Sequence, residues 1–121
     1  MADVVYLVQD MLFSSKIRET AKPFGLTLQG VRDPAALAAA AAGGAKLVIV
    51  DLRLPAALDA LGALGANPAA AAVPSIGFVD HELIDVMDAA RARGCGQVMA
   101  KGQFSAALPR LLAQLVPPTA A

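Results

Sequence analysis

The sequence predicts an α/β fold in which five parallel strands form one sheet with helices on both faces. Short apolar runs recur along the chain, as is typical of strands that are buried on both sides of a parallel sheet. Each run is followed by a segment with helical spacing or helix-start residues, and repeated strand-then-helix units form parallel sheets with right-handed crossovers. With 121 residues, the chain is expected to form one domain over residues 1–121, with 116–121 as a tail.

The strand predictions depend on where the apolar runs begin and end. The most informative run, Leu47 to Val50, is continuous and leads directly into Asp51, with Pro55 four residues later. A second segment, 26–31, alternates apolar and polar residues, which is typical of a half-covered edge strand. The five predicted strands are 4–8, 26–31, 47–50, 75–79 and 97–100.

The helix predictions depend on capping residues and on Gly or Pro at the ends. The predicted helices are 11–21, 34–42, 55–64, a segment from Asp80 or His81 to Arg93, and 105–115. The residues expected to start them include Ser14 or Ser15, Asp33 with Pro34, Asp80 or His81, and Ser105. Pro109 then falls in the first turn of the last helix, where proline is tolerated. The alanine run 69–72 is expected to be a surface connection.

Charge and cysteine content limit the classes of function. Ten Lys and Arg balance ten Asp and Glu, so the chain shows no electrostatic footprint for nucleic acid or an anionic membrane. The single cysteine, Cys95, cannot form an internal disulfide, which fits a reducing compartment. With no signal segment and no long apolar span, the sequence predicts a cytoplasmic protein. The alanine-rich surface leaves a homodimer open.

Charged residues follow three of the predicted strands. Asp10 follows the first, Asp51 the third and Lys101 the fifth, so the three side chains are expected at the carboxyl edge of the sheet. Two carboxylates near a strand-end carbonyl suit Mg²⁺, and a metal with a lysine can hold phosphoryl oxygens while an aspartate attacks phosphorus. The competing interpretation is that the aspartates cap helices and the lysine neutralises them.

Over nearly its whole length the chain resembles the response-regulator receiver domain. The segment YLVQD is similar to the acidic end of the family's first strand, and LVIVDLRLP resembles the phosphoacceptor strand with its following proline. The segment ARARGCGQVMAK resembles the approach to the family's lysine. The resemblance implies a flavodoxin-like, three-layer (βα)5 sandwich with strand order 2-1-3-4-5.

The resemblance also implies roles for individual residues. Asp51 would be the phosphoacceptor and Lys101 the phosphate-pairing lysine. Asp10 and Asp51 would bind Mg²⁺ together with the backbone carbonyl of Arg53, and Gln9 would be at most a weak ligand. The sequence leaves open whether the Arg53 side chain reaches over the site or points to solvent.

The chain departs from the receiver pattern at several positions. Gln9 stands where receivers usually have the first of two adjacent acids, which predicts a weaker metal site. The family's Ser or Thr at the end of the fourth strand falls at Val79, and the aromatic switch residue falls at Val98. Lys101 is followed by Gly102, so a cis proline is excluded there. These differences indicate an atypical receiver or a pseudo-receiver.

The leading hypothesis is a stand-alone receiver-like signalling protein of a two-component phosphorelay, and not an enzyme. Its partners would be a histidine kinase or phosphotransfer protein and a downstream protein. The downstream protein would bind the face made by the fourth predicted helix, the fifth strand and the last helix. One alternative is a pseudo-receiver that binds partners without phosphorylation. Another is a small phosphohydrolase, disfavoured because no second acid lies two residues beyond Asp51. His81, beside the predicted site, could tune it but more simply starts a helix.

Overall fold

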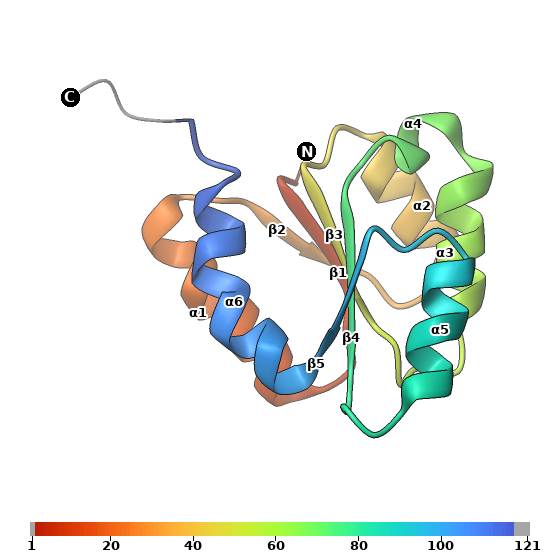
Figure 1. Cartoon of the computed structure of the whole chain (residues 1–121). Helices are drawn as coiled ribbons and strands as arrows, with labels where there is room; N and C mark the ends of the chain where they lie inside the picture. The colour runs from red at the N-terminus through yellow and green to blue at the C-terminus, as the bar shows by residue number, and fades with distance from the viewer. Residues whose placement is uncertain (1, 118–121) are drawn as a thin grey trace.

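Five parallel strands form the central sheet of the computed structural model, which describes residues 2–117 (Figure 1). The sheet order is β2-β1-β3-β4-β5, which confirms the predicted 2-1-3-4-5 arrangement. The strands are β1 Val4–Leu7, β2 Leu28–Gly30, β3 Leu47–Asp51, β4 Ser75–Val79 and β5 Gln97–Ala100. Each agrees with a predicted apolar run to within two residues at either end. Residues 118–121 of the predicted tail lie outside the described part of the chain.

Helices cover both faces of this sheet (Figure 1). They are α1 Met11–Ala21, the 3₁₀ turn η1 Lys22–Phe24, α2 Pro34–Ala42, α3 Ala57–Ala66, α4 Pro68–Ala71, α5 Ile84–Ala92 and α6 Lys101–Ala113. Helices α1 and α6 pack on one face, and α2, α3 and α5 lie on the other. The first crossover, through α1, is therefore on the opposite face from the second, through α2.

Alternation along the strands divides the core into two layers. In β1, Val4 and Tyr6 face α1 and α6, whereas Val5 and Leu7 face α2 and α3. Successive side chains of a strand point to opposite faces of the sheet, so a strand that is apolar throughout is buried on both. Each fully buried side chain of this size contributes about 1.5–3 kcal/mol relative to an exposed one. The apolar runs in the sequence therefore determine both the strands and the three layers.

The starts of the last two helices differ from the prediction. Helix α6 begins at Lys101, directly after β5, and not at Ser105. Pro109 therefore lies inside the helix, but at an exposed position where water can replace the lost backbone hydrogen bond. Helix α5 begins at Ile84 and neither Asp80 nor His81 caps it. The Asp80 carboxylate instead faces two cations, as described below.

One further capping prediction and one loop prediction are corrected by the structure. Helix α1 is capped by Asp10, whose Oδ1 accepts hydrogen bonds from the amides of Leu12 at 2.9 Å and Phe13 at 3.3 Å. Ser14, expected as a cap, is buried, and its hydroxyl donates to the Val8 carbonyl at 3.3 Å. The alanine run after Pro68 is part of the short helix α4, which Asn67 caps.

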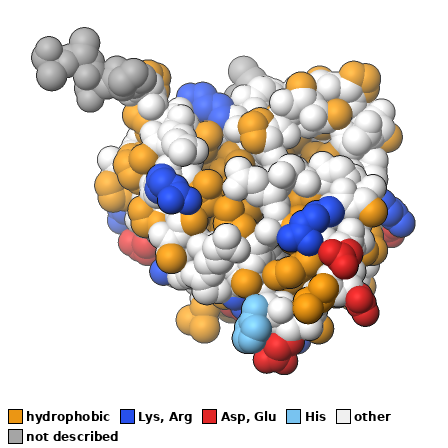
Figure 2. Space-filling view, viewed as in Figure 1, with side chains coloured by type: hydrophobic (Ala, Val, Ile, Leu, Met, Phe, Trp, Pro, Cys, Tyr) orange, Lys and Arg blue, Asp and Glu red, His pale blue; other side chains and the backbone are white. Residues whose placement is uncertain are grey.

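Charged side chains of both signs are interspersed on the face shown in Figure 2. Among residues 2–117, no helix combines the length and the apolar character that crossing a membrane requires.

Candidate functional site

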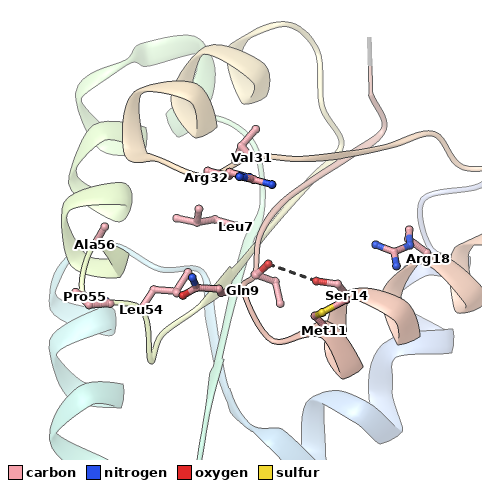
Figure 3. Close-up of a pocket in the computed structure, with 11 residues that line it drawn as sticks. Leu7, Gln9, Met11, Ser14, Arg18, Val31, Arg32, Leu54, Pro55 and Ala56 are labelled. Atoms are coloured by element: carbon pink, nitrogen blue, oxygen red, sulfur yellow. Dashed lines mark hydrogen bonds between the residues drawn. The ribbon is translucent and has the colours of Figure 1, made fainter.

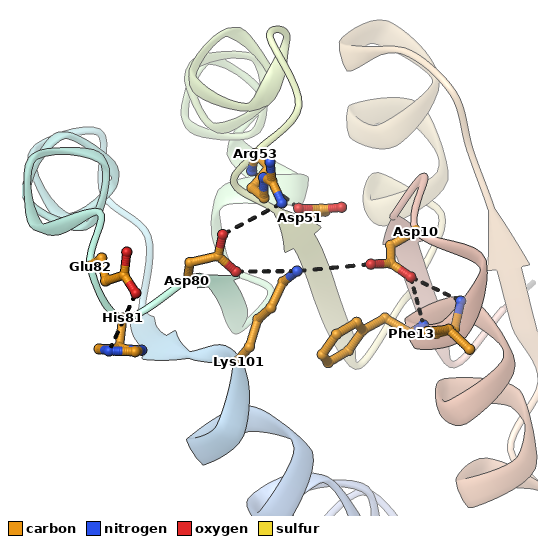
Figure 4. A network of polar contacts seen from close by, with 9 residues as sticks. Asp10, Phe13, Asp51, Arg53, Asp80, His81, Glu82 and Lys101 are labelled. Atoms are coloured by element: carbon orange, nitrogen blue, oxygen red, sulfur yellow. Dashed lines mark hydrogen bonds and ion pairs between the residues drawn. The ribbon is translucent and has the colours of Figure 1, made fainter.

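The strand register brings four charged residues to the carboxyl edge of the sheet (Figure 4). Asp51 is the last residue of β3, and Asp10 lies between β1 and α1. Val79, the last residue of β4, pairs with Ala100, the last residue of β5. The residues that follow them, Asp80 and Lys101, therefore leave the sheet side by side. The predicted convergence of Asp10, Asp51 and Lys101 at one edge is therefore what the backbone produces.

Lys101 lies at the centre of this site, between two carboxylates. Its ammonium nitrogen is 3.2 Å from Oδ1 of Asp80 and 3.9 Å from Oδ2 of Asp10. The same nitrogen lies 5.4 Å from the centroid of the Phe13 ring, in a cation–π arrangement. No ion pair between Lys101 and Asp51 forms within 4.0 Å in residues 2–117. The lysine is thus close to Asp51 but is held by other partners.

An aromatic stack fixes the ring beneath the ammonium group. Phe13 stacks on Phe78 with ring centroids 4.8 Å apart, and Phe78 stacks on Phe104 at 4.5 Å. Phe78 and Phe104 are fully buried. Because the three rings come from α1, β4 and α6, they join the elements that carry Asp10, Asp80 and Lys101.

Asp51 is the one buried carboxylate in the described chain, with 4% of its surface exposed. Its Oδ1 accepts a hydrogen bond from the backbone amide of Arg53 at 3.1 Å. Burial raises the pKa of Asp51, and the nearby negative charge of Asp10 raises it further. The Arg53 amide and the positive charge of Lys101 oppose this shift without cancelling it. The environment of Asp51 therefore favours a bound cation, which would relieve the cost of its negative charge.

The Arg53 side chain resolves an alternative that the sequence left open. Its Nη1 is 3.4 Å from Oδ2 of Asp80, so the guanidinium lies over the site edge and does not simply point to solvent. Asp80 therefore faces Arg53 with one oxygen and Lys101 with the other (Figure 4). His81 points away from this network and faces Glu82 at 3.8 Å, and both side chains are largely exposed.

Solved structures with the same architecture are receiver domains. The response regulator from Hahella chejuensis matches with a TM-score of 0.79 at 18% identity, over 95% of each chain. The receiver domain of a sensor histidine kinase from Pseudomonas aeruginosa, with magnesium coordinated in its active site cleft, matches with a TM-score of 0.78 at 19% identity, over 94% of this chain and 96% of that one. The chemotaxis response regulator CheY4 of Vibrio cholerae matches with a TM-score of 0.73 at 17% identity, over 96% and 99%.

The chain has the fold of a response-regulator receiver domain. This confirms the predicted fold at the level of architecture and strand order. A scan against protein-family models and a search of curated proteins give no match for the sequence.

The two positions of the receiver fold at which switch residues were predicted to be lost lie in the apolar core. Val79 is fully buried at the end of β4, and Val98 in β5 packs against the same cluster, on the side of α2, α3 and α5. Gly77 pairs with Val98 in the sheet, two residues before Val79. Valine has no hydrogen-bonding side chain, so neither position can respond to a phosphoryl oxygen by forming a polar contact.

The donors for a divalent cation in this receiver fold are few. Within residues 2–117 there is no cluster of three or more His, Cys, Asp or Glu side chains arranged to hold a metal. Asp10 and Asp51 are oxygen donors of the kind that Mg²⁺ prefers, and their mutual repulsion at a buried position favours a cation. However, Oδ1 of Asp10 is already used to cap α1. The residues therefore fit Mg²⁺, but as a weak site.

Sequence reasoning did not identify two of the residues that organise the site. Asp80 was interpreted as a helix cap, although its position directly after β4 carried the same signal as Asp51 after β3. Phe13 falls within the predicted helix 11–21, and nothing in that pattern indicates its contact with Lys101. Gln9, predicted as a weak ligand, is exposed and lines a cavity next to β1. No contact in the structure tests its role as a ligand.

Proposed function

We propose that this protein is a receiver-like signalling domain in which Asp51 accepts a phosphoryl group and the modified protein binds a downstream partner. The supporting observation is the convergence of Asp51, Asp10 and Lys101 at one sheet edge of a receiver fold. Solved structures at this level of sequence identity support only the fold. We therefore base the proposed function on the residues at the carboxyl edge of the sheet.

In the proposed reaction a carboxylate oxygen of Asp51 attacks the phosphorus of a phosphohistidine or a small acyl phosphate. The new P–O bond forms as the bond from phosphorus to the donor's nitrogen or oxygen breaks, and the donor leaves with the electron pair. Lys101 would pair with the phosphoryl oxygens, which requires it to leave Asp80, 3.2 Å away. The Phe13 ring keeps the ammonium near this edge while the partner changes.

Magnesium would be held by the carboxylates of Asp10 and Asp51 with the backbone carbonyl of Arg53. When bound, it would neutralise the charge of the buried carboxylate and of the incoming phosphoryl group. The missing second acid at Gln9 predicts that Mg²⁺ binds weakly, so phosphorylation would require a high Mg²⁺ concentration.

The decisive experiment is phosphorylation by a small acyl-phosphate donor with Mg²⁺, followed by intact mass. A single phosphoryl adduct is expected for the unmodified protein, none for Asp51→Asn, and an unchanged adduct for the control Asp59→Asn, an exposed aspartate in the first turn of α3. Repeated turnover of the donor without a stable adduct would instead indicate a phosphohydrolase. An adduct that survives Asp51→Asn would contradict the proposal.

A second candidate function is a binding module that works without phosphorylation. Lys101 already faces the Asp80 carboxylate, which can satisfy the lysine in place of a phosphoryl group. The buried Val79 also lacks the hydroxyl that would contact that group. This candidate predicts no adduct and no Mg²⁺ affinity in the same experiment.

We place the partner surface on the face of α5, β5 and α6 in both cases. Leu83 and Ile84, at the start of α5, are large apolar side chains that are 39% and 62% exposed. They follow Asp80 by only a few residues, so a change at Asp80 would reach them through a short segment of backbone.

A further inference from the structure

A cavity of about 700 Å³ lies beside the acidic site, at the carboxyl ends of β1 and β2 (Figure 3). It is lined by the end of β1 and the residues that follow it, by one side of α1 from Met11 to Arg18, by Val31 and Arg32 after β2, and by the loop before α3. Its volume falls within the range of small-molecule sites in proteins. The cavity is separate from the Lys101 cluster, since none of Asp10, Asp80 and Lys101 lines it.

The cavity occupies the topological switch point of the sheet. β1 is followed by α1 on one face, whereas β3 is followed by α3 on the other, and these two strands are neighbours. The chain diverges between them and leaves a crevice, which is where open α/β sheets bind ligands. The lining contains residues from both sides of this divergence, such as Ser14 on α1 and Leu54 before α3.

The charged groups in the cavity are all positive. Arg18 and Arg32 line it, and no carboxylate of the described residues does. The Arg18 guanidinium has a neutral partner, the Tyr6 hydroxyl at 3.4 Å, and Arg32 forms no hydrogen bond or ion pair with residues 2–117. In contrast, Lys101 and Arg53 both face carboxylates. Two guanidinium groups without carboxylate partners favour an anion, which arginine can bind with paired hydrogen bonds.

The other residues that line the cavity favour a small organic molecule over a free inorganic ion. Leu7, Val31, Leu54 and Pro55 form an apolar wall, and Gln9 adds an amide that can donate and accept hydrogen bonds. Figure 3 shows Gln9 between the Leu54 loop and Ser14. A cavity with a few polar groups on an apolar wall is typical of sites for small organic molecules.

We propose that this cavity binds a small organic anion of about mononucleotide size. Its phosphoryl or carboxylate group pairs with the guanidinium groups of Arg18 and Arg32, and its apolar or aromatic portion packs against Leu54 and Val31. The proposal stands independently of phosphorylation at Asp51.

The test is an NMR titration of ¹⁵N-labelled protein in EDTA, so that no metal-dependent binding at Asp51 contributes. The probes are adenosine monophosphate, phenyl phosphate, benzoate and inorganic phosphate. Saturable shifts are expected at residues 7–18, 31–32 and 54–56 with at least one organic probe, and with weaker affinity for inorganic phosphate. The phosphate and carboxylate arms identify which anionic group is preferred.

Matched variants separate the cavity from general charge. Arg18→Gln with Arg32→Gln should weaken binding by about tenfold or more, since each charged hydrogen bond contributes on that scale. Lys16→Gln with Arg110→Gln removes two exposed cations elsewhere and should leave binding unchanged. Arg32→Glu alone, at an exposed side chain without partners, should also abolish binding without affecting folding.

Three results would overturn the proposal. The first is no saturable shift with any organic probe. The second is a set of shifts centred on Asp51 and Lys101 and not on the cavity. The third is equal affinity for inorganic phosphate and the organic probes, which would mean that the apolar wall contributes nothing.

Discussion

Replacing Asp80 with asparagine removes the charge that now holds Lys101 and keeps the size of the side chain. The Asp80 carboxylate lies 3.2 Å from the Lys101 ammonium and 3.4 Å from the Arg53 guanidinium. In the proposed reaction, Lys101 must exchange Asp80 for the phosphoryl group on Asp51. Asp80→Asn should therefore make the protein slightly less stable and Asp51 faster to phosphorylate.

Both magnitudes follow from the exposure of the partners. The side chains of Lys101, Asp80 and Arg53 are 26%, 38% and 58% exposed, so solvent screens both ion pairs. Partly exposed pairs contribute about 0.2–1 kcal/mol each, and their loss should lower the free energy of unfolding by about 1 kcal/mol. If separating Lys101 from Asp80 contributes about 0.5–1 kcal/mol to the barrier, its removal accelerates phosphorylation about two- to fivefold.

The assay is the time course of phosphoryl adduct formation by intact mass, at fixed Mg²⁺ and acyl-phosphate concentrations. Asp88→Asn is the matched control because the exposed Asp88 on α5 pairs with Arg91 at 3.1 Å and is not one of the carboxylates that face Lys101. The acceleration should shrink as salt rises, since salt screens the pair in the unmodified protein. An Asp80→Asn rate equal to or below that of the Asp88→Asn protein would refute the idea that Asp80 competes for Lys101.

Three further predictions concern the core and the acids. Phe78→Ala should lower the free energy of unfolding in urea by about 3–5 kcal/mol, because Phe78 is fully buried between the rings of Phe13 and Phe104. Burial raises the pKa of Asp51, so above its unfolded-state pKa the folded state holds more protons. The free energy of unfolding should therefore fall as the pH rises from the unfolded-state pKa of Asp51 to its folded-state pKa. In EDTA, the Asp51→Asn protein should lack this pH dependence and should be more stable than the unmodified protein at pH 7. Asp10→Asn keeps a side-chain oxygen that can cap α1, so it should weaken Mg²⁺ binding, measured by calorimetry, with little change in stability. Asp10→Ala should weaken Mg²⁺ binding and also lower the free energy of unfolding in urea by about 0.5–2 kcal/mol.

The strands could be predicted because each depends on a local pattern, whereas their order was implied by the resemblance to receiver domains. The run from Leu47 to Val50 is apolar at every position, which is typical of a strand buried on both faces. Once five strands alternate with helices along the chain, few topologies remain. Asp51 could be predicted as a site residue for the same reason, since a carboxylate that directly follows a buried strand lies at the carboxyl edge of the sheet.

The ion pairs could not be predicted because they depend on register and not on local sequence. Asp80 directly follows a strand and precedes a helical segment, which is also what a helix cap looks like. Its pairing with Lys101 follows from the alignment of Val79 with Ala100, which joins residues that are 20 or more positions apart. The cavity was missed for a similar reason, because Arg18 and Arg32 approach the same crevice from two different elements.

The two valines in the core determine how a signal could leave Asp51. A ligand shifts a conformational equilibrium only through contacts that differ between the two states. Val79 and Val98 pack in one apolar cluster, and their side chains have no polar atom that a phosphoryl group could attract. The charged contacts at the same edge do differ, because a phosphoryl group on Asp51 would compete with Asp80 for Lys101. Asp80 leads into the short segment before α5, so we expect a response to the proposed phosphorylation to pass through the ion pairs of Asp80.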